Sequence, residues 1–112
     1  MLTIEDGVIS LTRGDTAYLA ISIQNDDGTD YEFHDGDTLT LSVKKDYNDE
    51  TPYLFQKTIA GGSPSFNILP TDTQGKDYGT YYYDIQWNTY LGEVFTIVGP
   101  ARFKLTKEVT LP

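Results

Sequence analysis

A single histidine is the only side chain of this sequence whose ordinary pKa lies near neutrality, so it is the first candidate for acid–base chemistry. His34 lies in the segment Phe33-His34-Asp35-Gly36, and Asp37 follows it closely. A general base needs a nucleophile within hydrogen-bond reach and a group that orients it. The sequence has no cysteine, and acid-rich turns commonly hold a histidine without any chemistry. We expect His34 to be a solvated turn residue, and the protein not to be an enzyme.

Carboxylates are the other reactive groups, and they are scattered over predicted loops. The loop carboxylates do not lie in an apolar strand pattern, where burial would raise the pKa for acid catalysis; they are Asp26, Asp27, Asp30, Glu32, Asp35, Asp37, Asp46, Asp49 and Glu50. Four of them supply oxygen ligands that calcium would accept, if they met at one end of the fold: Asp26, Asp27, Asp30 and Asp37. Their spacing differs from that of the helix-loop-helix calcium motif, and aspartates in turns bond to the local backbone. We therefore predict turn residues, with no metal and no cofactor.

The tripeptide Arg13-Gly14-Asp15 matches the one that integrins bind. It lies between two predicted strands, where glycine and aspartate form tight hairpin turns. We interpret it as a turn, with Thr16 at the start of the next strand.

Tyrosines are the remaining candidates for function, since the chain contains nine of them. Alternation places Tyr82 and Tyr18 on outer faces, and Tyr53 and Tyr90 lie at predicted strand ends. Exposed tyrosines stabilise sheets through cross-strand pairs, anchor protein interfaces or stack on sugar rings. The candidate interface residues are therefore Tyr18, Tyr53, Tyr82 and Tyr90, and a sugar platform would use Tyr82, Trp87 and Tyr90.

The elements that must position these side chains are β-strands, because apolar residues alternate with polar ones along most of the chain. The predicted strands cover residues 8–12, 17–24, 38–44, 53–59, 65–69, 81–87, 93–98 and 102–109. Residues 70–76 form a connection, with one helical turn started by Thr71 or Asp72. Gly99 and Pro100 interrupt the last two strands. Seven to eight short strands without a long helix predict a single all-β domain, residues 1–112, that is a sandwich or a barrel.

The segment 77–87 favours the sandwich. Asp77, Gly79, Tyr81 and Tyr83 follow the spacing that opens strand F of immunoglobulin-like domains, with Tyr83 in place of the disulfide cysteine. In that corner a buried tyrosine hydroxyl bonds to backbone a few residues upstream. The predicted fold is an immunoglobulin-like antiparallel β-sandwich. The usual core tryptophan of strand C is missing, and Leu41 takes its position.

Composition limits the partners. The formal charge is −9, from 17 acidic and 8 basic residues, so the surface repels nucleic acid and anionic lipid. Residues 1–6 do not have the basic start of a secretory signal, and no stretch approaches the ~20 apolar residues of a membrane span. Without cysteine there is no disulfide and no cysteine-based zinc site. We expect a chain kept in a cytoplasm or carried on a larger particle.

Three stretches together resemble a known family: "LTRGDT" from Leu11, "GDTLTLSVKK" from Gly36 and "YGTYYYDI" from Tyr78. They are similar to the N-terminal domain of phage baseplate upper proteins, and of related tail and head-fibre accessory proteins of phages that infect Gram-positive bacteria. The stretch from Gly99 to Thr110 is similar too. This resemblance implies an immunoglobulin-like domain that attaches a receptor-binding or fibre component to the virion. It also implies no catalytic residues.

The sequence therefore predicts a non-enzymatic virion protein, assembled in the bacterial cytoplasm, that docks parts of a tail, baseplate or capsid. Its expected partners are further copies of itself in a homo-oligomer or another virion protein, with edge strands and exposed tyrosines in the contact. The expected contact segments are residues 8–12, 46–53 and 102–109. The alternative is a carbohydrate-binding module for host wall glycan.

Overall fold

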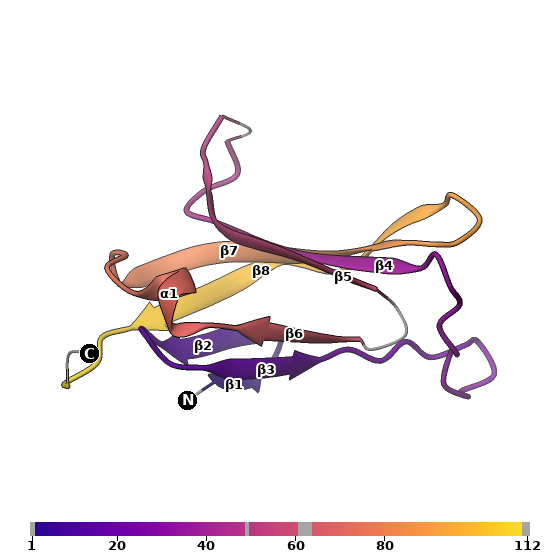
Figure 1. Cartoon of the computed structure of the whole chain (residues 1–112), viewed down its shortest axis with the longest axis horizontal. Coiled ribbons are helices and arrows are strands. Elements are labelled where there is room, and N and C mark those ends of the chain that lie inside the picture. The colour runs from indigo at the N-terminus through magenta and orange to yellow at the C-terminus, as the bar shows by residue number, and fades with distance from the viewer. Residues whose placement is uncertain (1, 49, 61–63, 111–112) are drawn as a thin grey trace.

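The computed structural model describes residues 2–48, 50–60 and 64–110, which form two β-sheets in two layers (Figure 1). Six strands form the larger sheet, in the order β1-β2-β8-β7-β4-β5. They are β1 (Leu2–Glu5), β2 (Val8–Thr12), β4 (Thr38–Lys44), β5 (Tyr53–Ala60), β7 (Gly79–Asn88) and β8 (Val94–Thr106). The smaller sheet pairs β3 (Ala17–Ala20) with β6 (Ser65–Ile68). The predicted all-β class is confirmed for the described residues.

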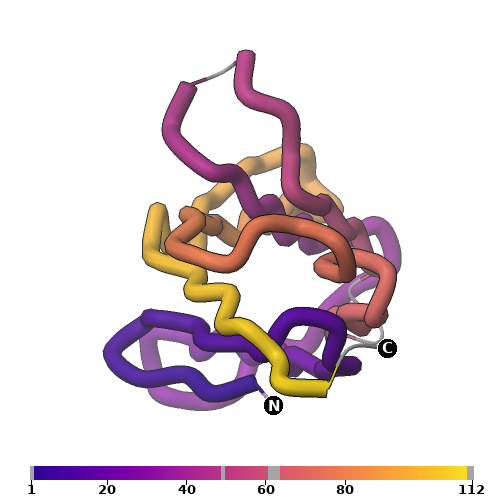
Figure 2. Tube along the Cα trace, turned by 90° about the vertical axis from the view of Figure 1, so that its left-hand side faces the viewer, coloured from indigo at the N-terminus to yellow at the C-terminus, as the bar shows by residue number. Residues whose placement is uncertain are grey.

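All neighbouring strands are antiparallel except β2 and β8, which run parallel. The fully antiparallel prediction was therefore wrong for this pair. Figure 2 shows the end of β8, in yellow, descending from the layer of β4, β5 and β7 to the layer of β1, β2 and β3. The large sheet consequently curls around one side of the core.

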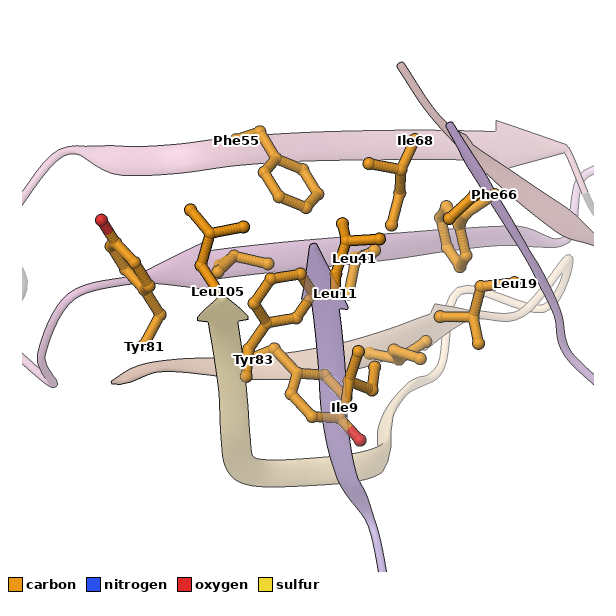
Figure 3. Close-up of a cluster of buried hydrophobic side chains, with 14 of the residues drawn as sticks. Ile9, Leu11, Leu19, Leu41, Phe55, Phe66, Ile68, Tyr81, Tyr83 and Leu105 are labelled. Carbon is orange, nitrogen blue, oxygen red and sulfur yellow. The ribbon is translucent and has the colours of Figure 1, made fainter. Parts of the chain in front are cut away.

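The core lies between the two layers and is built by the alternation that the sequence shows. Inward residues of each strand are buried, as in the patterns of β4 and β7. Figure 3 shows Leu41, Phe55 and Tyr83 of the large sheet facing Phe66 and Leu19 of the small one. Leu41 is fully buried, in agreement with the core position predicted for it.

The corner before β7 has the predicted geometry. The Tyr81 hydroxyl donates a hydrogen bond of 2.5 Å to the carbonyl oxygen of Asp77, four residues upstream. Tyr83, in the position of the cysteine, donates to the carbonyl oxygen of Gly7 at 2.6 Å. Its ring also lies edge-on to Phe103, with a centroid distance of 6.4 Å. Tyr83 thus ties β7 to the turn between β1 and β2 with a hydrogen bond and ring packing.

The strands differ most from the prediction at β1, β3 and β8. Strand β1 was missed, although Asp6 and Gly7 have the positive φ values of 51° and 78° that a two-residue hairpin turn requires. Strand β3 ends at Ala20. Strand β8 runs through Gly99 and Pro100. These two residues form a register shift in the pairing with β7, between the pairs Tyr83↔Ala101 and Ile85↔Val98.

The connection after β6 contains α1 (Pro70–Thr73), a single turn. It begins after Leu69, whose backbone N–H donates to the Asp72 carboxylate at 2.7 Å. The start predicted at Thr71 or Asp72 was therefore late, although Asp72 does act at this helix end. None of the helical structure in the described residues is long and apolar enough to cross a membrane.

Candidate functional site

A groove of about 280 Å³ crosses the outer face of the large sheet, and we call it the sheet groove. Its floor comes from the outward positions of three neighbouring strands, which are Thr40 and Ser42 of β4, Gln56 of β5, and Asp84 and Gln86 of β7. Its wall consists of Lys44, Asp46, Tyr47, Tyr53 and Tyr82. The remaining lining residues are Tyr83 and Pro100. The floor is polar because the alternate residues of β4 and β7 fill the core.

The wall of the sheet groove is aromatic. The rings of Tyr47 and Tyr82 lie with their centroids 4.6 Å apart and their planes tilted by 33°. The Lys44 ammonium lies 4.9 Å from the centre of the Tyr53 ring, within the range of a cation–π contact. These contacts hold the rings against the rim, so that less side-chain entropy is lost when a partner binds.

The loop that carries Tyr47 leaves the layers and projects beyond β5 (Figure 1). Its base is fixed by the Asp46 carboxylate, which accepts hydrogen bonds from the Thr51 hydroxyl at 2.6 Å and the Asn48 backbone N–H at 2.9 Å. These hydrogen bonds, the Thr51 one above all, lower the pKa of Asp46. The base of the predicted contact segment 46–53 is therefore held together by hydrogen bonds. Residue 49 lies outside the described residues.

The floor of the sheet groove offers donors and acceptors at fixed places. The Gln56 amide donates to the Ser42 hydroxyl at 2.9 Å, and the hydroxyls of Thr40 and Thr58 lie 3.1 Å apart. Partial burial raises the pKa of Asp84, and the positive charge of Lys44 offsets this in part. A half-desolvated carboxylate gains from a ligand that donates hydrogen bonds or carries positive charge.

A second cluster lies at the end of the fold where β4 begins and β7 ends. Asp37 is buried there, and its carboxylate accepts hydrogen bonds from the Tyr31 hydroxyl and the backbone N–H groups of His34 and Tyr90, each at 2.8 Å. Burial by itself raises the pKa of Asp37, but these hydrogen bonds outweigh it and hold the pKa below its ordinary value. Asp37 therefore joins the 31–37 segment to the turn after β7.

The same cluster explains Tyr31 and His34. Burial and the hydrogen bond to Asp37 raise the pKa of Tyr31 to about 12. The His34 ring stacks on Tyr90 with centroids 4.2 Å apart, and its Nδ1 lies 3.0 Å from the Tyr31 hydroxyl. Its side chain remains 52% exposed, in keeping with the predicted turn residue. The Trp87 indole N–H is buried beside this cluster and makes no hydrogen bond of standard geometry within the described residues, but it lies close enough to the Asp37 carboxylate to help lower its pKa.

The aspartates considered as calcium ligands are not arranged as a calcium site. Asp37 is buried and fully occupied by hydrogen bonds, and Asp27 accepts hydrogen bonds from the backbone N–H and hydroxyl of Thr29. Within residues 2–48, 50–60 and 64–110, no three His, Asp or Glu side chains are grouped so that they could hold a metal ion.

Arg13 of the integrin-like tripeptide is held by the fold itself. Its guanidinium pairs with the Glu108 carboxylate, with Nη2 at 2.7 Å from Oε1, and donates to the Lys76 carbonyl oxygen at 2.7 Å. The Gly14 backbone N–H donates to the Thr73 hydroxyl at 2.8 Å. The tripeptide therefore joins β2 to α1 and to the end of β8, as a turn between two strands.

The four predicted interface tyrosines do not form one surface. Tyr53 and Tyr82 both line the sheet groove. Tyr18 lies on β3 and is 70% exposed, and Tyr90 stacks on His34 in the turn after β7. The predicted sugar platform is not assembled either, because Trp87 faces Tyr31, at 4.9 Å between ring centroids, from the opposite side of β7 to Tyr82.

The predicted contact strands are not edges. Residues 8–12 form β2, which lies between β1 and β8, and β8 in turn lies between β2 and β7. Sequence reasoning also missed Tyr47, Gln56 and Gln86. The outward phase of β5 and β7 indicates Gln56 and Gln86, but only the fold of the loop brings Tyr47 onto Tyr82.

Comparisons with known protein families, with curated proteins and with solved structures give no match to this chain.

Proposed function

We propose that the chain is a non-enzymatic docking module of a phage virion, in which an immunoglobulin-like sandwich presents the sheet groove to a protein partner. The observation that carries the docking role is the pairing of Tyr47 with Tyr82 beside Tyr53, over a polar floor. Tyrosine supplies a large contact area at low entropy cost and is enriched at the energetic centres of protein interfaces.

The strand order supports the immunoglobulin-like part of the proposal. The run β8-β7-β4-β5 corresponds to strands G, F, C and C′ of a variable-type domain, and the pair β3-β6 corresponds to B and E. The Tyr81 hydroxyl bond to Asp77 matches the tyrosine corner of that fold and supports the proposal. The parallel β2 and the extra strand β1 extend the G edge of this arrangement.

The virion setting rests on the sequence resemblance described above, in which the domain attaches fibre or receptor-binding components. The partners are then a neighbouring virion protein and further copies of the chain around a virion axis. Such a module would dock virion parts in the tail, baseplate or capsid, after assembly in the host cytoplasm.

The test is incorporation into particles. We expect the wild-type chain to be found in purified virions by mass spectrometry, and Tyr82→Ala together with Tyr53→Ala to reduce its copy number at least about tenfold, as for loss of interface anchors. The matched control is Tyr78→Ala, which removes a tyrosine that is 58% exposed outside the sheet groove. A wild-type chain that is strictly monomeric and missing from purified particles overturns the proposal.

One observation favours a second function, recognition of host wall glycan. Gln56, Asp84 and Gln86 lie beside the tyrosine wall of the sheet groove, and amide and carboxylate groups next to aromatic rings suit sugar hydroxyls and sugar faces. Calorimetric titration with oligosaccharides from the host wall distinguishes the two functions. Binding that Gln86→Ala weakens and Tyr78→Ala leaves intact would establish the glycan function in place of the protein one.

A further inference from the structure

The small sheet leaves one edge of β3 open. Strand β3 pairs with β6 from Ala17↔Ile68 to Ala20↔Ser65, and the next backbone bond joins the Ile21 N–H to the Pro64 carbonyl oxygen at 2.8 Å. Because hydrogen-bonded positions alternate along an antiparallel pair, Leu19 and Ala17 bond toward β6. The N–H and C=O groups of Tyr18 and Ala20 therefore point away from β6, and no partner for them is found in the described part of the chain.

An apolar pocket of about 490 Å³ lies along this open edge. One wall is the end of β3 and the extended segment after it, with Leu19, Ile21 and Ile23, and the opposite wall is the β1–β2 hairpin, with Ile4 and Ile9. The floor is supplied by the inner faces of β7 and β8, where Ile85, Ile97 and Val98 lie. β3 and the hairpin share a layer (Figure 2), but no backbone ladder joins them in the described residues.

The shape and chemistry of the pocket along β3 suit an extended polypeptide better than a small apolar molecule. One wall offers unpaired backbone donors and acceptors on alternate residues, which only another strand satisfies in register. The floor and the opposite wall offer branched apolar side chains, which accept every second side chain of such a strand. A small apolar ligand would fill the pocket and leave the backbone groups of Tyr18 and Ala20 unused.

Charge indicates which chain supplies the strand. The β1–β2 hairpin turns at Glu5 and Asp6, and the chain after β3 enters a turn that contains Asp26 and Asp27. Because β3 begins close to where β2 ends, both acidic turns lie toward the same end of the pocket, the one where β3 finishes (Figure 1). The whole chain carries −9. A second copy brings the same net negative charge to this end of the pocket, whereas a segment with lysine or arginine at that end is attracted.

We infer that this side of the molecule is a strand-acceptor site. An extended segment of another protein, with alternating apolar residues and with basic residues where it meets the two acidic turns, pairs with the Tyr18–Ala20 edge of β3 and closes the gap toward the β1–β2 hairpin. This site lies between β3 and the β1–β2 hairpin, over the inner face of β7 and β8, and is separate from the sheet groove. The inference therefore does not depend on what binds in the sheet groove.

The test uses the full chain and nine-residue peptides in which valine or isoleucine alternates with threonine, flanked by lysines. We expect the backbone amides of Tyr18 and Ala20, which exchange with solvent freely in the chain alone, to become at least about tenfold slower in hydrogen exchange when peptide is bound. Peptides with glutamate in place of the flanking lysines should bind more weakly than the lysine peptides at low salt. At high salt the difference in affinity between the two kinds of peptide should be smaller.

Ala20→Pro is the decisive variant, because it removes the outward N–H of Ala20 and leaves the bonds to β6 in place. We expect it to weaken peptide binding about tenfold, as for one lost backbone bond at an edge. If this variant does not fold, Ile97→Ser tests the pocket floor by the same readout. Pro64→Ala, on the paired edge, is the control and should bind as the wild type does.

Two outcomes overturn the inference. The first is exchange at Tyr18 and Ala20 that stays unchanged at millimolar concentrations of every peptide. The second is protection of these amides that grows with the concentration of the chain alone, which would assign the edge to a second copy of this protein.

Discussion

The side chain of Tyr81 connects the core to the residues just before β7. Its ring is buried, and its hydroxyl donates to the Asp77 carbonyl oxygen at 2.5 Å. Tyr81→Phe keeps the ring and removes this hydrogen bond, so we expect the free energy of unfolding to fall by about 1 kcal/mol. Urea denaturation measures the change. Tyr82→Phe, on the opposite face of β7, is the control, and equal stability losses for both variants would contradict a special role for Tyr81.

Asp37 should make the stability of the protein depend on pH in the acid range. Its folded-state pKa is lowered, by hydrogen bonds that outweigh burial, while its pKa in the unfolded chain is about 3.9. The stabilisation is therefore fully present above the unfolded pKa, and it is lost as the pH falls through the lower folded pKa. We expect Asp37→Asn to lower the free energy of unfolding by about 2 kcal/mol at pH 7, with the difference from wild type shrinking near pH 2.

Thermal unfolding followed by circular dichroism across this pH range checks the prediction. Asp35→Asn is the matched control, because Asp35 is an exposed carboxylate in the same turn. A loss for Asp37→Asn that is the same at pH 2 and pH 7 would mean that the carboxylate charge contributes nothing.

At the scale of elements, alternation was sufficient to find most strands and their inward faces. The buried pattern of β4, with Leu39, Leu41 and Val43 inside, is the one that the sequence predicts. From the same phase Tyr82 was placed on the outer face, where the sheet groove now contains it. Local patterns work here because each strand is half buried, so that its two faces differ in polarity.

The features that were not predicted depend on contacts between distant segments. The parallel pairing of β2 with β8 joins residues about as far apart as the chain allows, as in Ile9↔Phe103, and no local pattern encodes it. The burial of Asp37 likewise depends on a distant donor, the backbone N–H of Tyr90 in the turn after β7, in addition to the nearby Tyr31 hydroxyl. In contrast, β1 was marked by Asp6-Gly7, a local hairpin signal that the prediction passed over.

Gly99 shows why β8 continues where an interruption was predicted. Its φ is +92°, and a Cβ atom there would lie 2.5 Å from the Tyr83 carbonyl oxygen. Glycine thus lets the extra residues of β8 approach β7 without breaking the sheet. We expect Gly99→Ala to cost about 2 kcal/mol or more in unfolding free energy, from left-handed strain and the backbone clash together.

Gly92→Ala is the matched control for this prediction. Gly92 has a similar φ of +86°, but a Cβ atom there would meet nothing within 4 Å. The difference between the two variants in urea denaturation isolates the clash, and a smaller loss at Gly99 than at Gly92 would contradict it.

At the scale of the whole molecule, the two proposed surfaces use the two ways in which a β-sandwich binds other chains. The sheet groove uses side chains on an outer face, with Tyr82 and Asp84 among them, whereas the acceptor site uses the backbone edge of β3. Under these two proposals, one module would hold two different neighbours at once. The excess of negative charge acts on both contacts and on the fold itself.

That charge gives the last prediction. With 17 acidic and 8 basic residues, the folded chain concentrates a net −9 on a small surface, and self-repulsion of this kind destabilises the compact state. Salt screens charges over about 10 Å at 0.1 M, so we expect the melting temperature at pH 7 to rise between roughly 10 mM and 150 mM sodium chloride. The ion pair of Arg13 with Glu108 works in the opposite direction, because screening weakens it. Glu108→Gln should therefore increase the gain with salt. A melting temperature that falls with salt in both proteins would show that local ion pairs, and not the net charge, dominate the electrostatics of this fold.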